Sequence, residues 1–305
     1  MATRKEVKSR ISSVKNIHKI TRAMEMVAAA RLRRAEQRIA AMRPYAQAIR
    51  KMTRQVSEAA GQMPRIELLE VRDRVESAGI LLVTGDRGLA GSFNTQIIRE
   101  GLRLKRELGS DGAKVRFSVV GRRGNSTMTF RGEDVRHSYV GFTDRPSFMN
   151  ARQISAELIS AYIDKEVDQV DLVYNRYVSP LTQYVRRQTL LPVQHAEVFG
   201  EGLPEEEKPS DEELAEAHMR AAWLYEPEAQ ELLPKLFEEY VDLSVYRALL
   251  ESAASEHGAR MTAMRNAAEN AQEMIGDLTL EMNRVRQAEI TQEILEVVAG
   301  AEALA

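Results

Sequence analysis

The 305-residue sequence contains no cysteine, which excludes disulfide bonds, thiolate metal sites and cysteine catalysis. Its five histidines are scattered along the chain, which argues against a metal centre. No run approaches the 18 uninterrupted apolar residues that suggest a membrane-spanning helix. The basic N-terminus lacks the apolar core of a secretory signal, and it merges without a break into a helical pattern. The sequence thus predicts a cytoplasmic protein without a cofactor.

Proline is absent from Lys235 to the C-terminus, and this stretch predicts one very long helix. Its apolar residues recur alternately every three and four positions, the pattern of a coiled-coil seam: Met261, Met264, Ala268, Ala271, Ile275, Leu278, Met282 and Val285. At 1.5 Å per residue the helix would extend roughly 100 Å, whereas a compact chain of this length is about 50 Å across. Most of the helix therefore needs a partner helix outside a globular domain.

The first 60 residues supply that partner. Their apolar stripe is interrupted at Pro44 and ends near Gly61: Val7, Ile11, Val14, Ile17, Thr21, Met24, Ala28, Leu32, Ala35, Ile39, Met42, Ala46, Ile49 and Val56. The two helices join the same central globule by opposite ends, so we expect them to run antiparallel. The C-terminal run is longer by about ten residues and should project beyond the pair as a single helix.

Charge supports the pairing of these two unlike helices. Residues 1–54 hold 15 Lys and Arg against 3 acids, whereas residues 235–305 hold 6 against 13. Opposite net charges on facing helices favour their association over self-pairing. A basic helix is also a footprint of nucleic-acid binding, which stays open as an alternative. Against it, the first 44 positions contain no aromatic residue on which bases could stack.

The central region changes period and predicts a Rossmann-like α/β domain with a largely parallel sheet. Short apolar runs predict strands at Gly79 to Asp86, Lys114 to Gly121 and Val170 to Val178, with a last strand near Gln183 to Pro192. Helical patterns alternate with them at Asn94 to Leu108, Asn125 to Phe130 and Ser147 to Val167. We thus expect four segments: helix 1–60, α/β domain 75–200, acidic connecting segment 201–231 and helix 232–305.

Two turns raise the alternative of a stand-alone nucleotide-binding protein. The segment Gly85 to Asn94 follows a strand and opens a helix, the position at which glycine-rich loops hold phosphates. It lacks the ending of a P-loop, and Asp86 would place a negative charge beside the phosphate. A tight structural turn that needs the backbone freedom of glycine explains it better. The turn Gly121 to Gly124 carries two arginines, and we interpret it as a solvated loop.

Several segments resemble the gamma subunit of the F-type ATP synthase, in the form found in bacteria. The matching segments are Lys19 to Glu36, Thr84 to Asn94, Tyr225 to Leu233, Ala254 to Ala271 and Arg286 to Ala301. They occur in the order of the family and run the full length of the chain. The start of the chain directly in the coiled-coil helix also favours a bacterial protein over an imported precursor.

The resemblance implies a non-catalytic central-stalk subunit of a proton-translocating complex. It implies that the coiled coil turns inside a ring of alpha and beta subunits, which carry the nucleotide sites. The globular foot would bind the epsilon subunit and the membrane-embedded c ring, on the cytoplasmic face of the cell membrane. The chain would transmit rotation between the c ring and the catalytic ring and regulate ATPase activity, without a cofactor, a metal or nucleic acid.

The resemblance also implies which residues contact the surrounding ring. Met24 matches the seam methionine that faces an acidic lever of the beta subunit, and Lys19 and Arg22 flank it. Five further residues match those that bond to loops of the ring: Arg260, Arg286, Gln287, Thr291 and Glu293. Taken singly, each has an ordinary alternative, since methionine often fills a helical core and charged residues usually face solvent.

Overall fold

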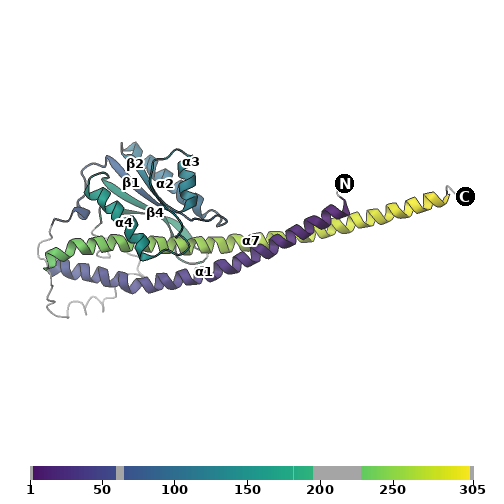
Figure 1. Ribbon diagram of the computed structural model, residues 1–305, viewed down its shortest axis with the longest axis horizontal. Helices are drawn as coiled ribbons and strands as arrows, with labels where there is room; N and C mark the ends of the chain where they lie inside the picture. Colours follow the sequence, from purple (N-terminus) through teal and green to yellow (C-terminus); the bar gives the residue numbers. More distant parts are fainter. Residues whose placement is uncertain (1–2, 60–64, 181, 195–227, 303–305) are drawn as a thin grey trace. The chain divides into compact units, whose positions relative to one another are not determined.

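The computed structural model describes residues 3–59, 65–180, 182–194 and 228–302. The chain divides into two compact units: one combines Met1–Ala30 with Gly258–Ala305, and the other is Arg31–His257. Two long helices, α1 (Arg4–Ala59) and α7 (Ala229–Glu302), contribute to both units (Figure 1). The fold class is as predicted, with long terminal helices and a central α/β domain.

A five-stranded sheet with strand order β3-β2-β1-β4-β5 forms the middle of the Arg31–His257 unit. Its strands are β1 (Ser77–Val83), β2 (Lys114–Val120), β3 (Val135–Tyr139), β4 (Gln169–Tyr177) and β5 (Gln183–Leu191). The first four are parallel, and β5 pairs with β4 in the antiparallel sense. The sheet is therefore largely parallel, and the four predicted strands are confirmed. The sequence missed β3 because this edge strand alternates half-buried and exposed residues and has no apolar run.

Helices cover both faces of the sheet. On one face lies α2 (Phe93–Ser110), beside α3 (Arg122–Phe130); α4 (Phe148–Ile163) and part of α7 share one apolar core against the other. The start of α4 is set by a capping box between Ser147 and Asn150, in agreement with the prediction. The prediction for α3 was wrong at its start, because α3 begins at Arg122, directly after its N-cap Gly121, and Arg122 to Gly124 form its first turn and not a loop.

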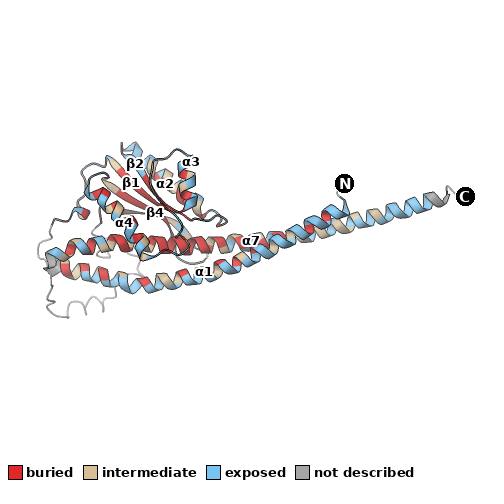
Figure 2. Cartoon of the chain, viewed as in Figure 1, coloured by how far each residue is buried: buried red, intermediate tan, exposed pale blue. Residues whose placement is uncertain are grey.

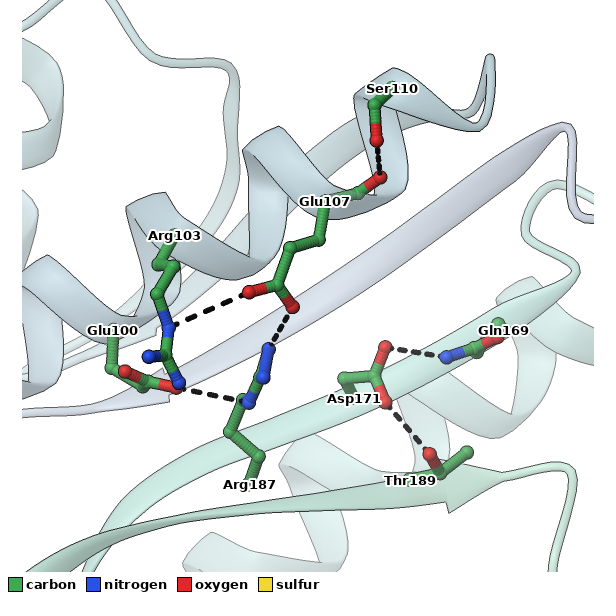
Figure 3. Close-up of polar contacts among 8 residues, drawn as sticks. All are labelled: Glu100, Arg103, Glu107, Ser110, Gln169, Asp171, Arg187 and Thr189. Atoms are coloured by element: carbon green, nitrogen blue, oxygen red, sulfur yellow. Dashed lines mark hydrogen bonds and ion pairs between the residues drawn. The ribbon is translucent and has the colours of Figure 1, made fainter.

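An ion-pair network ties α2 to the edge strand β5. Figure 3 shows Arg187 of β5 between Glu100 and Glu107 of α2, and its Nε lies 3.0 Å from the Glu100 carboxylate. Arg103 contacts the same two glutamates. The side chains of Arg103 and Glu107 are about half exposed, so each pair contributes little to stability, and the network chiefly orients α2 across the sheet.

Both long helices contain a proline, and the one in α1 was predicted to interrupt the apolar stripe. Pro44 lies within α1, which continues through it, and α7 begins six residues before Lys235 and includes Pro234. Pro44 is exposed, so water can satisfy the carbonyl that loses its helical hydrogen bond. The acidic connecting segment lies outside the described residues up to residue 227, and the division into four segments stays a prediction.

The predicted stripe of α1 is buried or half-buried at every position but one. Within the Arg31–His257 unit, Met42 and Ile49 of α1 pack with Leu243 and Leu250 of α7 in one apolar cluster. Ile17 of the other unit is the exception in the stripe, because it is 52% exposed. The half-buried His18 lies next to Ile17 and takes its place in the stripe. The step from Val14 to the next covered position is therefore four residues and not three.

The sheet-facing part of α7 is buried on all sides. Every residue from Ala248 to His257 is buried, as Figure 2 shows for the stretch of α7 beside the sheet. A helix that is buried all round belongs in a core, which explains why polar residues in this stretch need partners inside the protein.

Candidate functional site

The carboxyl ends of the sheet strands are tied together by Asp86. Its carboxylate accepts hydrogen bonds from the backbone N–H of Arg122 (3.0 Å) and Gly141 (2.9 Å), and from the N–H (3.2 Å) and hydroxyl (3.0 Å) of Thr143. These donors follow β2 and β3, and Asp86 itself follows β1. The aspartate therefore uses the donors that a phosphate would need, and it links three strand ends.

The glycine turn at this edge is filled by helix α7. Gly85 donates to Oδ1 of Asn94 at 2.8 Å, and a Cβ at Gly85 would lie 2.7 Å from the carboxylate of Glu256. The cavity lined by Thr84, Thr143, Ser252 and Glu256 measures about 10 Å³, room for about one water molecule. A carboxylate of α7 thus occupies the corner in which a Rossmann-like sheet would hold phosphate, and the turn is structural.

Two buried carboxyl groups elsewhere in this unit also have structural partners. Asp171 of β4 accepts from Thr189 (2.9 Å) and Gln169 (2.7 Å); burial raises its pKa, against the effect of these bonds (Figure 3). Burial likewise raises the pKa of Asp242 on α7, which accepts from Ser155 of α4. Among the described residues, no group of three or more acidic or histidine side chains is arranged to hold a metal.

The other unit contains the paired ends of α1 and α7. Its α7 seam residues are buried or half-buried from Met261 to Val285, at each of the eight predicted positions. Arg265 of α7 lies beside Glu25 of α1. Val7, which lies nearer the N-terminus of α1 than Glu25 does, is also completely buried. Val7 can find a partner within this unit only if α7 runs in the opposite direction, so the pair is antiparallel.

Sequence analysis missed the polar bridge inside this coiled coil. Glu25 is 7% exposed and lies between Arg22 (2.7 Å) and Arg265 (3.1 Å). Burial alone would raise the pKa of Glu25, but the bonds and charges of Arg265 and Arg22 outweigh it and lower the pKa. Glu25 is one of only three acids in the first 54 residues and sits one position from the seam. An acid isolated in an otherwise basic helix was the sequence feature that could have indicated this polar bridge.

We expect Glu25→Gln to destabilise the coiled coil by about 1 kcal/mol at pH 7, a small value because both arginines are about half exposed. The pKa of Glu25 is lowered on folding, so its stabilising effect is present above its ordinary value of 4.5. It disappears as pH falls through the lowered value. Urea unfolding followed by circular dichroism at pH 7 and pH 3 measures this difference. The control is Glu269→Gln at an exposed position of α7, and an equal effect of both variants would contradict the role of Glu25.

The predicted contact residues fall into two groups. Lys19, Arg22 and Met24 lie within two turns of α1; the first two are exposed and Met24 is half-buried. On α7, four contact residues are exposed within two turns: Arg286, Gln287, Thr291 and Glu293. The structure does not bring the groups together, because Thr291 lies roughly 40 Å along the helix from Arg265, which is beside Glu25.

Two further observations concern the α7 contact residues. The hydroxyl of Thr291 donates to the carbonyl of Gln287 at 2.9 Å, and the spacing of four residues places these two on one face of the helix. Arg260 is only 7% exposed, so most of its surface is covered by the protein itself.

Beyond the paired region, no helix of the described residues covers α7. Residues 291–299 are all exposed, and the largest apolar side chains among them are Ile294 (58%), Leu295 (62%), Val297 (72%) and Val298 (50%). Figure 1 shows this end of α7 continuing past the N-terminus of α1. None of the helices within the described ranges combines the length and apolar character that crossing a membrane requires.

These features define a class of protein: one with two long antiparallel terminal helices and a central α/β domain, in which the described residues form no metal cluster. Comparison with known proteins identifies the family. The family model for ATP synthase matches residues 3–304. The gamma chain of Rubrobacter xylanophilus is 41% identical over 306 residues, covering 100% of this chain and 99% of that one. The gamma chain of Moorella thermoacetica is 40% identical over 304 residues, covering 100% of both.

Solved structures agree with this assignment. The central stalk and c ring structure of the Tetrahymena thermophila mitochondrial ATP synthase includes a chain with a TM-score of 0.58 and 28% identity, covering 81% of this chain and 99% of that one. A chain of the Euglena gracilis enzyme has a TM-score of 0.68 at 20% identity, covering 99% and 94%, and shows the same fold. The chain belongs to the family of ATP synthase gamma chains. It is a non-catalytic central-stalk subunit. This assignment takes the place of the two alternatives that the sequence left open, a nucleic-acid-binding protein and a stand-alone nucleotide-binding protein.

Proposed function

We propose that the paired helices of this chain turn inside a ring of alpha and beta subunits and contact it through the two groups of residues described above. The observation that carries the proposal is the uncovered apolar end of α7. An exposed apolar patch on a helix marks a protein interaction surface, and an isolated helix is only marginally stable in water. A surrounding ring of subunits would cover this segment on all sides.

The contacts would act by differences in free energy between conformations of the ring. A shaft that touches each conformation equally shifts nothing, whereas unequal contacts bias a catalytic subunit towards one state. Lys19 and Arg22 supply positive charge and Met24 an adaptable apolar surface on α1. Arg286, Gln287, Thr291 and Glu293 supply hydrogen-bonding groups on α7. Arg260, which is largely covered by the protein itself, would support the helix pair beside the seam residue Met261.

We further propose that the Arg31–His257 unit is the foot that binds an epsilon subunit and the c ring on the cytoplasmic face of the membrane. Support comes from the Tetrahymena structure, which contains the central stalk together with the c ring. The chain would be attached to the membrane only through that complex. Proton flow would turn the c ring and the foot together, and α1 and α7 would carry the rotation to the catalytic ring.

The α7 contact group provides the test. Replacing Arg286, Gln287, Thr291 and Glu293 by alanine should leave the helix content of the isolated chain intact, because alanine is the best helix former. In an assembly with alpha and beta subunits, we expect ATP turnover to fall by about tenfold or more. One charge-assisted bond contributes about 1.5 to 3 kcal/mol, and 1.36 kcal/mol corresponds to a factor of ten in rate.

A matched control replaces four exposed polar residues of the paired part of the same helix: Glu269, Gln272, Glu273 and Asp277. This control should turn over ATP at a rate close to that of the unmodified chain. If the contact variant also assembles and hydrolyses ATP at the unmodified rate, its four residues are solvated surface and the proposed contact is wrong.

A further inference from the structure

Helix α7 is fixed against the sheet by polar contacts in addition to apolar packing. Phe237, Val241 and Val245 are fully buried in the main core of the foot. Apolar burial is non-directional, whereas a hydrogen bond requires a particular distance and angle. The polar contacts of α7 therefore decide the rotation of the helix about its own axis more strictly than its apolar contacts do.

Two serines of α7 bind the backbone of one residue in the sheet. The N–H of Asn175 in β4 donates to Oγ of Ser252 at 3.3 Å, and the hydroxyl of Ser255 donates to the carbonyl of Asn175 at 3.3 Å. Ser252 is 3% exposed and Ser255 is fully buried. These bonds join successive positions of one helix face to a single strand residue.

The position of Asn175 explains why its backbone is available. The pairing of β4 with β1 ends at Val173, opposite Leu82. Asn175 lies two residues further along, so its N–H and C=O point to the same side as those of Val173. No β1 residue is paired with it there. The two serines thus take the place of a neighbouring strand, and α7 continues the hydrogen bonding of the sheet.

A third contact holds α7 from another direction. Ser155 of α4 donates a hydrogen bond to Asp242 of α7, and both residues are buried. Asp242 and Ser255 are 13 positions apart, which places them about 140° apart around a helix with 3.6 residues per turn. Bonds to two different elements at well-separated angles resist rotation of α7 in both senses.

We propose that Asp242, Ser252 and Ser255, which we name the key residues, lock α7 against rotation relative to the foot and so transmit torque into the shaft. All three lie within the Arg31–His257 unit, and α7 continues without a break to Glu302. They are positioning residues that touch no nucleotide. The inference rests on the rotation of the foot with the c ring, as set out under the proposed function.

The test uses the complete ATP synthase in membrane vesicles that carry the triple variant Ser155→Ala, Ser252→Ala, Ser255→Ala. Two quantities are measured: the rate of ATP hydrolysis, and the largest proton gradient that hydrolysis can build. We expect hydrolysis within about twofold of the unmodified rate and a maximal gradient reduced to about half or less. Without directional bonds, the helix yields at a lower opposing load, although apolar packing still holds it when load is absent.

Ser244→Ala is the matched control, because the hydroxyl of Ser244 on α7 donates at 2.8 Å to the backbone carbonyl of Tyr240 in its own helix. It should change neither quantity. An unmodified maximal gradient in the triple variant, or equal losses of hydrolysis and gradient, would show that the key residues only stabilise the fold and would overturn the proposal.

If the triple variant does not assemble, the double variant Ser252→Ala, Ser255→Ala decides, because it leaves Asp242 with its donor. The same selective loss of gradient supports the proposal, and its absence, or failure of the double variant to assemble, overturns it. Failure of the ring-contact proposal would give a different result. The alanine substitutions at Arg286, Gln287, Thr291 and Glu293 would then leave the rate of ATP hydrolysis unchanged.

Discussion

Gly121→Ala should strongly destabilise the foot. Gly121 connects β2 to α3 with φ 95° and ψ 137°, a region of backbone space that side chains strongly disfavour. A Cβ there would lie 2.4 Å from the carbonyl oxygen of Thr84, a backbone atom that cannot move aside, because the strands around it are hydrogen-bonded. Strain and overpacking together should cost about 4 kcal/mol, a large part of the 5 to 15 kcal/mol that stabilises a typical protein.

Gly132→Ala separates the two causes. Gly132 also has a positive φ, of 74°, but a Cβ there would meet nothing within 4 Å. We expect a loss of about 1 kcal/mol, from backbone strain alone. Chemical denaturation of both variants gives the difference. Equal losses would mean that the close approach of Gly121 to Thr84 does not limit this turn.

Removal of residues 1–20 should unfold the partnered end of α7 or make the chain aggregate. The deleted segment includes Val7 and Ile11, which are 0% and 7% exposed, and the register set by Glu25 and Arg265 places it opposite the seam after Arg265. The truncation would expose Ile275, Leu278, Met282 and Val285 as a continuous apolar stripe. Loss of ellipticity beyond that of the deleted residues, or a shift to large species in size-exclusion chromatography, measures the effect.

The control removes a similar length from the other end. Deletion of residues 291–305 takes away a segment whose residues up to 299 are all exposed, so the paired helices keep their partners. This variant should keep the thermal transition and solubility of the full chain. If both truncations behave alike, then the N-terminal segment does not cover the seam of α7.

Together these variants separate the parts of the rotor. Gly121 tests the foot, the first 20 residues test the coiled coil, and the key residues test the joint between α7 and the sheet. The ring-contact residues are the only set expected to slow ATP turnover while the isolated chain stays folded. The pattern of losses across the four sets would therefore assign a role to each part.

Patterns along the chain were sufficient wherever one periodicity persisted. The steps of three and four from Met261 to Val285 predicted the buried face of α7, because a helix with one apolar stripe can bury only that stripe. The apolar runs at β1, β2 and β4 likewise predicted strands covered on both faces. The polar edge strand β3 carried no such signal.

The role of the glycine turn was decided by residues distant in sequence. Gly85 and Asp86 could open a phosphate site or a structural turn, and local sequence fits both. The choice depends on Glu256 of α7, whose carboxylate fills the corner, and on Thr143, which bonds to Asp86. Neither contact can be inferred from spacing, because contacts between distant segments depend on how the whole chain packs.

The sequence by itself determined the two long helices, their antiparallel pairing, the parallel sheet and the family, since helical period, charge and strand composition are local properties that repeat over many residues. Tertiary structure alone decided that Glu25 is buried between Arg22 and Arg265, and that Ser252 and Ser255 continue the sheet at Asn175. A buried polar group is stable only beside its partner, and these partners lie as far as 240 positions away along the chain.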